Sequence, residues 1–152
     1  MTDTLTDQRA APTTLAQLIA GANEDSLHRR PAPGKWSIVE IIAHLAEDEL
    51  TSSWRYRQMI EHDGVQLLGF DQELWARLGD YSSWTVRDAL DMYRLLRLAN
   101  VALLSRLTPA EWERSGVHAE RGPMTVRSLA AHMAGHDRNH IEQIKRILAG
   151  GM

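Results

Sequence analysis

Apolar residues recur at helical spacing along most of this chain, and no segment alternates between apolar and polar residues as a strand would. The strongest stripe follows Ser37, which together with Glu40 matches the S-x-x-E capping box of a helix N-terminus. This pattern predicts a helix from Ser37 to about His62, where the sequence HDG ends it. The apolar positions of that helix are Ile38, Ile41, Ile42, Leu45 and Leu50.

The N-terminal part of the chain is predicted to be a tail followed by a helix. Residues 1–11 are expected to form a flexible tail. A first helix is predicted after Pro12, although Gly21 and Asn23 leave its C-terminal end open. The segment PAPGKW, residues 31–36, then separates this helix from the next one.

Two further long helices are predicted in the second half of the chain. One opens at Thr85, which with Asp88 forms another capping box, and the other runs from Thr125 to the glycines that follow residue 149. Short helices are expected at 71–79 and 108–114, and loops at 63–70 and 115–123. Four long helices joined in this way predict an all-α fold, a four-helix bundle with short connecting helices, as one domain over residues 12–152.

The composition narrows the class of protein. An apolar content of 43% predicts a globular chain, and a net charge of -3 with dispersed arginines and lysines makes nucleic acid an unexpected partner. No apolar run approaches the roughly 20 residues of a membrane helix, and no secretory signal is recognisable, so we expect a cytoplasmic protein that does not span a membrane. The chain has no cysteine, so any thiol must arrive with a substrate.

Candidate chemistry lies in the segment AHMAGHDRNHIEQI, residues 131–144, on the last predicted helix. His132, His136 and His140 are four residues apart, which places neighbouring rings about 6 Å apart along the helix axis. Two imidazoles at this spacing can bind one metal ion, as in H-E-x-x-H sites. His132 and His140 are too far apart to share an ion, so the spacing allows either His132 with His136 or His136 with His140.

A third ligand has to come from a facing helix, and His44 is the best candidate. It lies within the apolar stripe of the helix at 37–62, so its ring is expected to point into the bundle, where helical bundles build metal sites. Glu47, one turn further, is a candidate ligand, partner of a ligand or catalytic base. Any one of these histidines, taken alone, is more readily explained as a core residue than as a metal ligand. Glu47, beside Asp48 and Glu49, is likewise more readily explained as a solvent-facing acid. Several imidazoles buried without partners would be costly, so their clustering favours a metal site.

The segments KWSIVEIIAHLAEDE and HMAGHDRNHIEQI together resemble the DinB superfamily, whose members are also described as DinB/YfiT-like metalloenzymes. The connecting segments FDQELWA, TPAEWERSGVH and RGPMTVRSLAAH resemble one subgroup, so the resemblance covers the chain from about residue 13 to residue 148. It implies a bundle of up-down-down-up topology, frequently a homodimer, with a divalent zinc or nickel ion held by three histidines.

The resemblance also implies which histidines hold the ion. His44 matches the ligand of the second helix, and His136 and His140 match the H-x-x-x-H of the last helix. His132 is then expected to pack or to line a pocket, and Gln143 to bond a ligand ring. Relatives in this superfamily include thiol-dependent S-transferases and a mycothiol-dependent maleylpyruvate isomerase.

The expected function is therefore that of a metal-dependent enzyme acting on a small-molecule substrate. Thiol S-transfer with a low-molecular-weight thiol as cosubstrate is the first reaction implied, and metal-assisted hydrolysis is the second; Glu47 would be the base in either. The alternative is a non-catalytic dimeric bundle that binds metal or serves in a stress response. Arg57, Arg94 and Arg97 are expected to be solvent-facing charges rather than contacts to an anionic substrate, and His118 is given no role.

Overall fold

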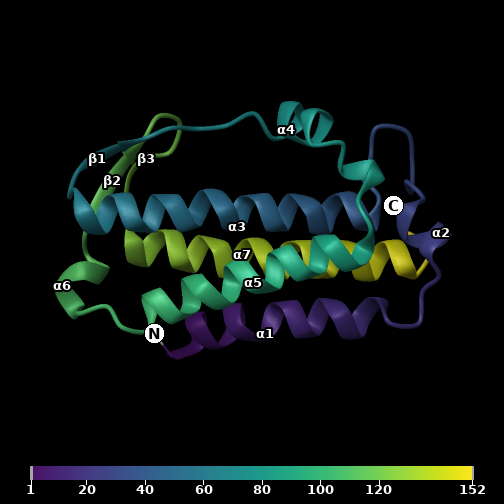
Figure 1. Ribbon diagram of the computed structural model, residues 1–152, viewed down its shortest axis with the longest axis horizontal. Coiled ribbons are helices and arrows are strands. Elements are labelled where there is room, and N and C mark those ends of the chain that lie inside the picture. Colours follow the sequence, from purple (N-terminus) through teal and green to yellow (C-terminus); the bar gives the residue numbers. More distant parts are fainter. Residues whose placement is uncertain (1, 152) are drawn as a thin grey trace.

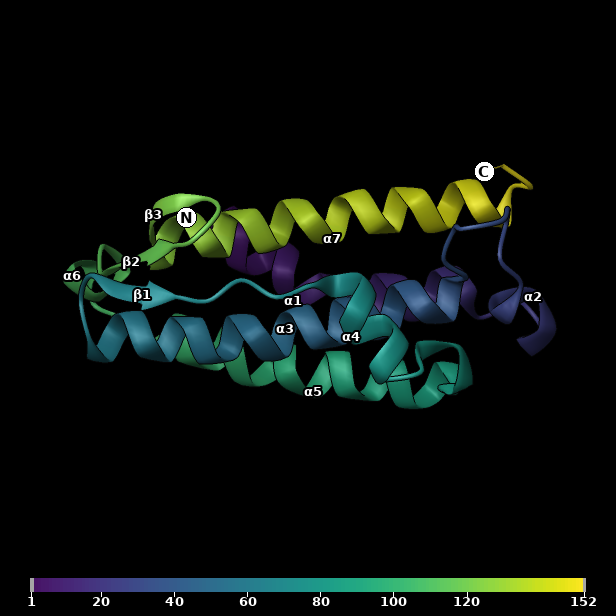
Figure 2. The same ribbon diagram turned by 90° about the horizontal axis from the view of Figure 1, so that it is seen from above.

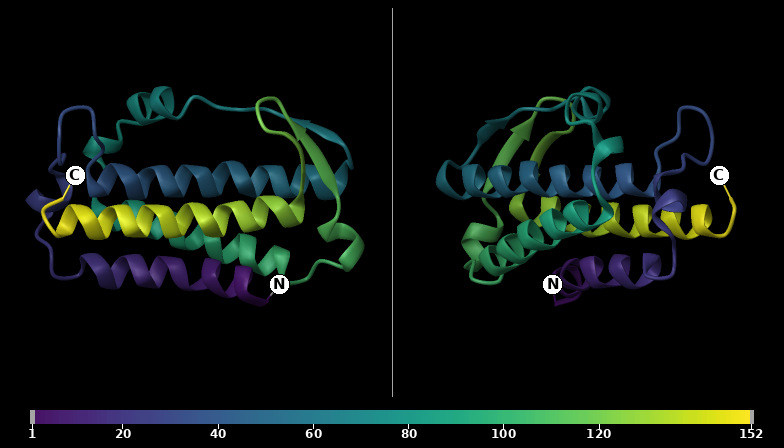
Figure 3. Two further views of the ribbon diagram at one scale, coloured as in Figure 1. Left: turned by 180° about the vertical axis from the view of Figure 1, so that it is seen from behind. Right: turned by 45° about the vertical axis from the view of Figure 1, so that its right-hand side comes forward.

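The computed structural model describes residues 2–151, whose four long helices pack side by side as a bundle (Figure 1). These helices are α1 (Thr2–Ile19), α3 (Ile38–Glu61), α5 (Val86–Leu104) and α7 (Val126–Leu148). α1 and α7 run in one direction and α3 and α5 in the other, as the front view (Figure 1) and the view from behind (Figure 3) both show. The predicted four-helix bundle of up-down-down-up topology is thus confirmed. No helix among the described residues is long and apolar enough to cross a bilayer.

Because α3 and α5 are parallel neighbours, the chain has to travel the length of the bundle between them (Figure 2). Residues 62–85 make this return along the side of α3. They form β1 (Val65–Leu67), α4 (Gln72–Leu78) and the one-turn 3-10 helix η1 (Tyr81–Ser83). The other short elements are α2 (Glu24–His28), α6 (Pro109–Trp112), β2 (Ser115–His118) and β3 (Gly122–Thr125).

The helices begin where the sequence provides caps. Ser37 accepts a hydrogen bond from the backbone N–H of Glu40 at 3.3 Å, and the Glu40 carboxylate accepts one from the N–H of Ser37 at 2.8 Å. Thr85 and Thr125 cap α5 and α7 through the N–H three residues on. Thr125 and Ser128 also form the reciprocal bond of a capping box, which the predicted pair Thr85 and Asp88 does not. These caps satisfy backbone donors that the first turn of a helix leaves free, so they fix the starting points of the helices.

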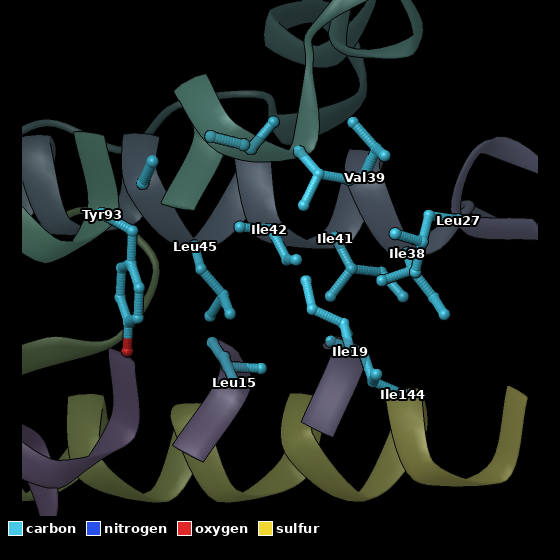
Figure 4. Packing of buried hydrophobic residues seen from close by; sticks show 14 of the residues in the cluster. Leu15, Ile19, Leu27, Ile38, Val39, Ile41, Ile42, Leu45, Tyr93 and Ile144 are labelled. Atoms are coloured by element: carbon cyan, nitrogen blue, oxygen red, sulfur yellow. The ribbon is translucent and has the colours of Figure 1, made fainter. Parts of the chain in front are cut away.

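The core joins α3 to its neighbours through aliphatic side chains that exclude solvent. Figure 4 shows Ile41, Ile42 and Leu45 of α3 facing Leu15 and Ile19 of α1. Each of the five is at most 4% exposed. Full burial of one such side chain contributes about 1.5–3 kcal/mol, so this contact supplies a large part of the stability that holds α3 in position.

Residues 2–11 form the beginning of α1 rather than the predicted flexible tail, and the helix continues through Pro12. A proline has no N–H to donate to the carbonyl four residues earlier, which here belongs to Gln8. That carbonyl instead accepts a hydrogen bond from Nη1 of Arg97 at 3.1 Å, and the Gln8 side chain donates to the carbonyl of Ala130 at 2.7 Å. Contacts with the rest of the bundle therefore replace the bond that Pro12 removes.

The prediction that the chain has no strands was wrong for the loops at 63–70 and 115–123. β1 pairs with β2 in parallel, and β2 pairs with β3 in antiparallel fashion. Each strand has three or four residues, which is too short for an alternating pattern to stand out in the sequence. Gly116 makes the contact between β1 and β2 possible, since a Cβ there would lie 2.7 Å from Cδ1 of Leu67.

Arg97 is buried, which corrects the prediction that it faces solvent. Its Nη2 pairs with Oε2 of Glu49 at 2.7 Å and its Nη1 with Oδ2 of Asp137 at 2.5 Å, and each of these side chains is at most 3% exposed. Burial alone lowers the pKa of Arg97, but the two carboxylates hold it above its ordinary value. Arg57 and Arg94 are exposed, as predicted.

Replacing Arg97 by methionine should lower the free energy of unfolding by about 3–5 kcal/mol, because it leaves two buried carboxylates without their cation. Urea denaturation of wild type and variant measures this difference. Arg87→Met is the control, since the Arg87 side chain is 89% exposed and its loss should change stability by less than about 0.5 kcal/mol. Equal stability of the two variants would contradict the importance assigned to the buried ion pairs.

Candidate metal centre

The structure brings together the three histidines that the sequence analysis selected. Nε2 of His136 lies 3.2 Å from Nε2 of His44 and 3.2 Å from Nε2 of His140. The ligand atoms of all three lie within 4.8 Å of one another. Two nitrogens bound to one tetrahedral ion at about 2.0–2.1 Å are about 3.3–3.4 Å apart. α3 supplies one ring and successive turns of α7 supply the other two. Two of the three nitrogen pairs are therefore close to the spacing that one divalent ion requires.

All three rings are neutral near pH 7. Burial, together with the charge of His140, lowers the pKa of His44 to about 4. Burial and the neighbouring histidines lower the pKa of His136 to about 3, and burial also lowers the pKa of His140. Since a neutral imidazole keeps a lone pair for a metal and an imidazolium does not, these rings are ready to bind an ion.

Two neighbours hold the rings in place. The side-chain oxygen of Gln143 lies 2.8 Å from Nδ1 of His140, as predicted, so Nδ1 donates its proton there and the lone pair of Nε2 faces the other histidines. Trp36 packs against His44 with ring centroids 5.0 Å apart. His132 does not join the group: its Nε2 accepts a hydrogen bond from Nη1 of Arg121 at 2.7 Å, outside the triad.

Asp48, rather than Glu47, is the carboxylate beside the histidines. Its Oδ2 lies 3.4 Å from Nε2 of His136 and 3.7 Å from Nε2 of His44. Burial raises the pKa of Asp48 to about 7, against the opposing charges of nearby arginines. Glu47 instead accepts the hydroxyl hydrogen bond of Tyr81 at 2.5 Å. Asp48 was not among the predicted site residues. Its spacing of four residues from His44 places it near that ring, but the same holds for Glu47 at three residues, so spacing alone does not choose between them.

A cavity of about 360 Å³ lies next to His136 and Asp48. Its other lining residues come from α3, α7, the segment from β1 to the start of α4, the end of β2 and the turn that follows it. They include Arg55, His118, Arg121 and His132. A larger hollow of about 720 Å³ lies among α1, α2 and the end of α7, and no histidine or carboxylate lines it within the described residues. Of these two cavities, the smaller one combines space with histidine and carboxylate side chains.

A sequence profile of the DinB superfamily matches residues 8–144 of the chain. The chain belongs to the DinB superfamily. The match includes both helices that carry the three histidines, so the resemblance seen in the sequence is confirmed over nearly the whole bundle.

The chain is similar to several bacterial proteins. One from Oceanobacillus iheyensis, named "Putative metal-dependent hydrolase", is 27% identical over 135 residues, which are 89% of this chain and 78% of the relative. YfiT from Bacillus subtilis carries the same name and is 21% identical over 137 residues, 90% of this chain and 77% of YfiT. The relatives are thus named as metal-dependent proteins, and this chain has a three-histidine group in which a metal fits.

Solved structures confirm the fold. The structure of YfiT is described as a four-helix bundle of unusual topology. It superposes on this chain with a TM-score of 0.90 at 20% identity, and the superposition covers 99% of this chain and 87% of YfiT. A mycothiol-dependent maleylpyruvate isomerase superposes with a TM-score of 0.76 at 9% identity, over 93% of this chain and 59% of the isomerase. The parallel arrangement of α3 and α5 is therefore a shared architecture.

Replacing any one of the three clustered histidines by alanine should abolish stoichiometric metal binding, because two imidazoles hold an ion far more weakly than three. Elemental mass spectrometry of untagged protein, dialysed after zinc loading, should give about one equivalent for wild type and for His132→Ala. His44→Ala, His136→Ala and His140→Ala should each be empty. Equal loss in all four variants, or none in any of them, would refute the single-site arrangement.

Gln143→Ala should keep the site but weaken zinc binding about 10- to 100-fold, since the ring of His140 loses the acceptor that orients it. Competition with a zinc-binding dye measures the affinity. The exposed neighbour Glu142 pairs with Lys145 at 2.7 Å, so Glu142→Ala serves as the matched control and should bind zinc as wild type does. A wild-type affinity in Gln143→Ala would show that its hydrogen bond does not support the site.

Proposed function

We propose that this protein is a divalent-metal-dependent enzyme that transfers a low-molecular-weight thiol to an electrophilic small molecule. The observation that carries the proposal is the convergence of three neutral Nε2 atoms beside a cavity of small-molecule size. His44, His136 and His140 would hold the ion, and zinc and nickel both suit a set of imidazole ligands. A bound divalent ion lowers the pKa of a coordinated thiol or water.

The residues of the chain have separate tasks in this reaction. The three histidines would hold the ion next to the cavity, which His136 lines, and the cavity would orient the electrophile. Asp48 accepts the proton that the thiol loses, because its carboxylate lies beside His44 and His136 at the cavity wall. The sulfur then attacks the electrophilic carbon, a carbon–sulfur bond forms, and the leaving group departs with its electron pair.

Glu47 is less suited than Asp48 to the role of base that the sequence suggested for it. Its carboxylate is engaged by the hydroxyl of Tyr81, a residue that also packs edge-on against Trp36, with ring centroids 6.3 Å apart. Trp36 in turn contacts His44. We propose that Glu47 positions the ligand His44 through this chain of contacts.

Metal-assisted hydrolysis is the second candidate, and the names of the relatives favour it. The same residues serve this reaction: the histidines hold the ion and Asp48 accepts a proton from water instead of from a thiol. The two reactions differ in the nucleophile, so the requirement for an added thiol separates them.

Asp48→Asn should keep about one equivalent of zinc but lower kcat about 100- to 10,000-fold, because an amide cannot accept the proton. The assay follows zinc-loaded protein with chlorobimane and a panel of thiols for S-transfer, and with p-nitrophenyl acetate alone for hydrolysis. Glu47→Gln should lower kcat less than Asp48→Asn.

Three results would count against these assignments. Loss of zinc from Asp48→Asn would make Asp48 a ligand rather than a base. Turnover of the ester without thiol would favour the hydrolase. No turnover in either assay by zinc-loaded wild type would favour the non-catalytic metal-binding bundle.

A further inference from the structure

Two guanidinium groups line the cavity beside His136 without a carboxylate partner. Arg55 of α3 donates from Nη2 to the carbonyl of Leu68 at 2.7 Å and stacks over the ring of Phe70 at 5.8 Å. Arg121, in the turn between β2 and β3, donates from Nη1 to Nε2 of His132 at 2.7 Å. No ion pair joins either guanidinium to an acid in the part of the chain that the structure describes. Their partners orient the two cations but do not neutralise them.

His118 adds a third donor at the same place. Its Nδ1 accepts hydrogen bonds from the backbone N–H groups of Glu120 at 3.2 Å and Arg121 at 3.4 Å, so the lone pair of that nitrogen is in use. The proton of a neutral ring then resides on Nε2, which lies 3.3 Å from Nη2 of Arg55, itself only a donor. Two donors at this distance need a shared acceptor, and an oxygen in the cavity would serve both.

The acids around the cavity leave this need unmet. Asp71 and Glu120 line it but are exposed, and the Asp71 carboxylate is occupied by the N–H groups of Glu73 and Leu74 at the start of α4. The charge of Asp48 acts on Arg55 and Arg121, but its carboxylate contacts His44 and His136 and forms no ion pair with either arginine. Arg55, His118 and Arg121 therefore present hydrogen-bond donors to the cavity, and the described acids that line it do not supply the acceptor they need.

We propose that Arg55, His118 and Arg121 form an anion subsite that binds a carboxylate group of the substrate. Guanidinium groups match the planar carboxylate with paired hydrogen bonds, and the volume of about 360 Å³ falls near the lower end for ligand pockets, about 300–1,000 Å³. The substrate class is thus a small carboxylic acid whose reacting atom lies toward His136. This inference rests on the proposed function, because it names the substrate class for the same cavity.

The test is a titration of zinc-loaded protein with acetate, benzoate and succinate, each compared with its neutral amide, followed by two-dimensional NMR of the ¹⁵N-labelled chain. At least one carboxylate should bind saturably while its amide does not. Arg121→Gln, a change on an exposed turn, and Arg55→Gln should each weaken that binding about tenfold or more. Arg55→Lys, which keeps the charge without the fork, should bind more tightly than Arg55→Gln.

Arg87→Gln is the control for net charge, since it removes one exposed arginine on α5 and should bind the carboxylate as wild type does. Zinc content is measured in every sample, so an empty metal site, which defeats the proposed function, is seen separately from a failure to bind anions. Two results would overturn the subsite: no saturable binding of any carboxylate to wild type, or equal affinity in wild type and both glutamine variants.

Discussion

The guanidinium of Arg97 joins all four long helices. Arg97 belongs to α5, and it binds the Gln8 carbonyl of α1, Glu49 of α3 and Asp137 of α7. Removing such charges from water is costly, so the arrangement is stable only while every partner is in place. These polar contacts therefore fix the position of each helix along the bundle axis. Aliphatic packing alone specifies that position less strictly.

The candidate metal centre depends on that position. Glu49 and Asp137 are direct chain neighbours of Asp48 and His136, so the ion pairs that hold α3 against α7 lie next to the residues that converge in the site. His44 and His136 are 92 residues apart in the chain, yet their Nε2 atoms lie 3.2 Å apart. A displacement of one helix by a single turn, about 5.4 Å, would separate them beyond the reach of one ion.

Much of this architecture was predictable from local signals. Capping residues such as Ser37 and Thr125 marked helix starts correctly, since they act on backbone donors within the same turn. The histidine triad could not be predicted from local signals alone. Helical spacing left two possible histidine pairs on α7, and only the family resemblance selected His136 with His140. The structure then brought the same three residues together.

The features that sequence reasoning missed all depend on contacts between distant segments. Pro12 indicates a helix start because it cannot donate a hydrogen bond to the Gln8 carbonyl, an effect that is visible in the local sequence. The bond that compensates for this loss comes from Arg97, 89 residues away, and is not visible there. The strands β1 and β2 are short and gain their stability by pairing with each other across the bundle end. Asp48 was overlooked beside Glu47 because both lie within one turn of His44, and only the fold shows which carboxylate faces α7.

In the proposed metal centre, one imidazole from α3 and two from α7 hold a single divalent ion. X-ray absorption spectroscopy of the untagged, zinc-loaded protein tests it most directly, because the outer-shell scattering of imidazole rings counts histidine ligands. We expect three imidazole ligands at about 2.0–2.1 Å together with at least one non-histidine ligand. A shell of oxygen atoms with one imidazole or none would contradict it.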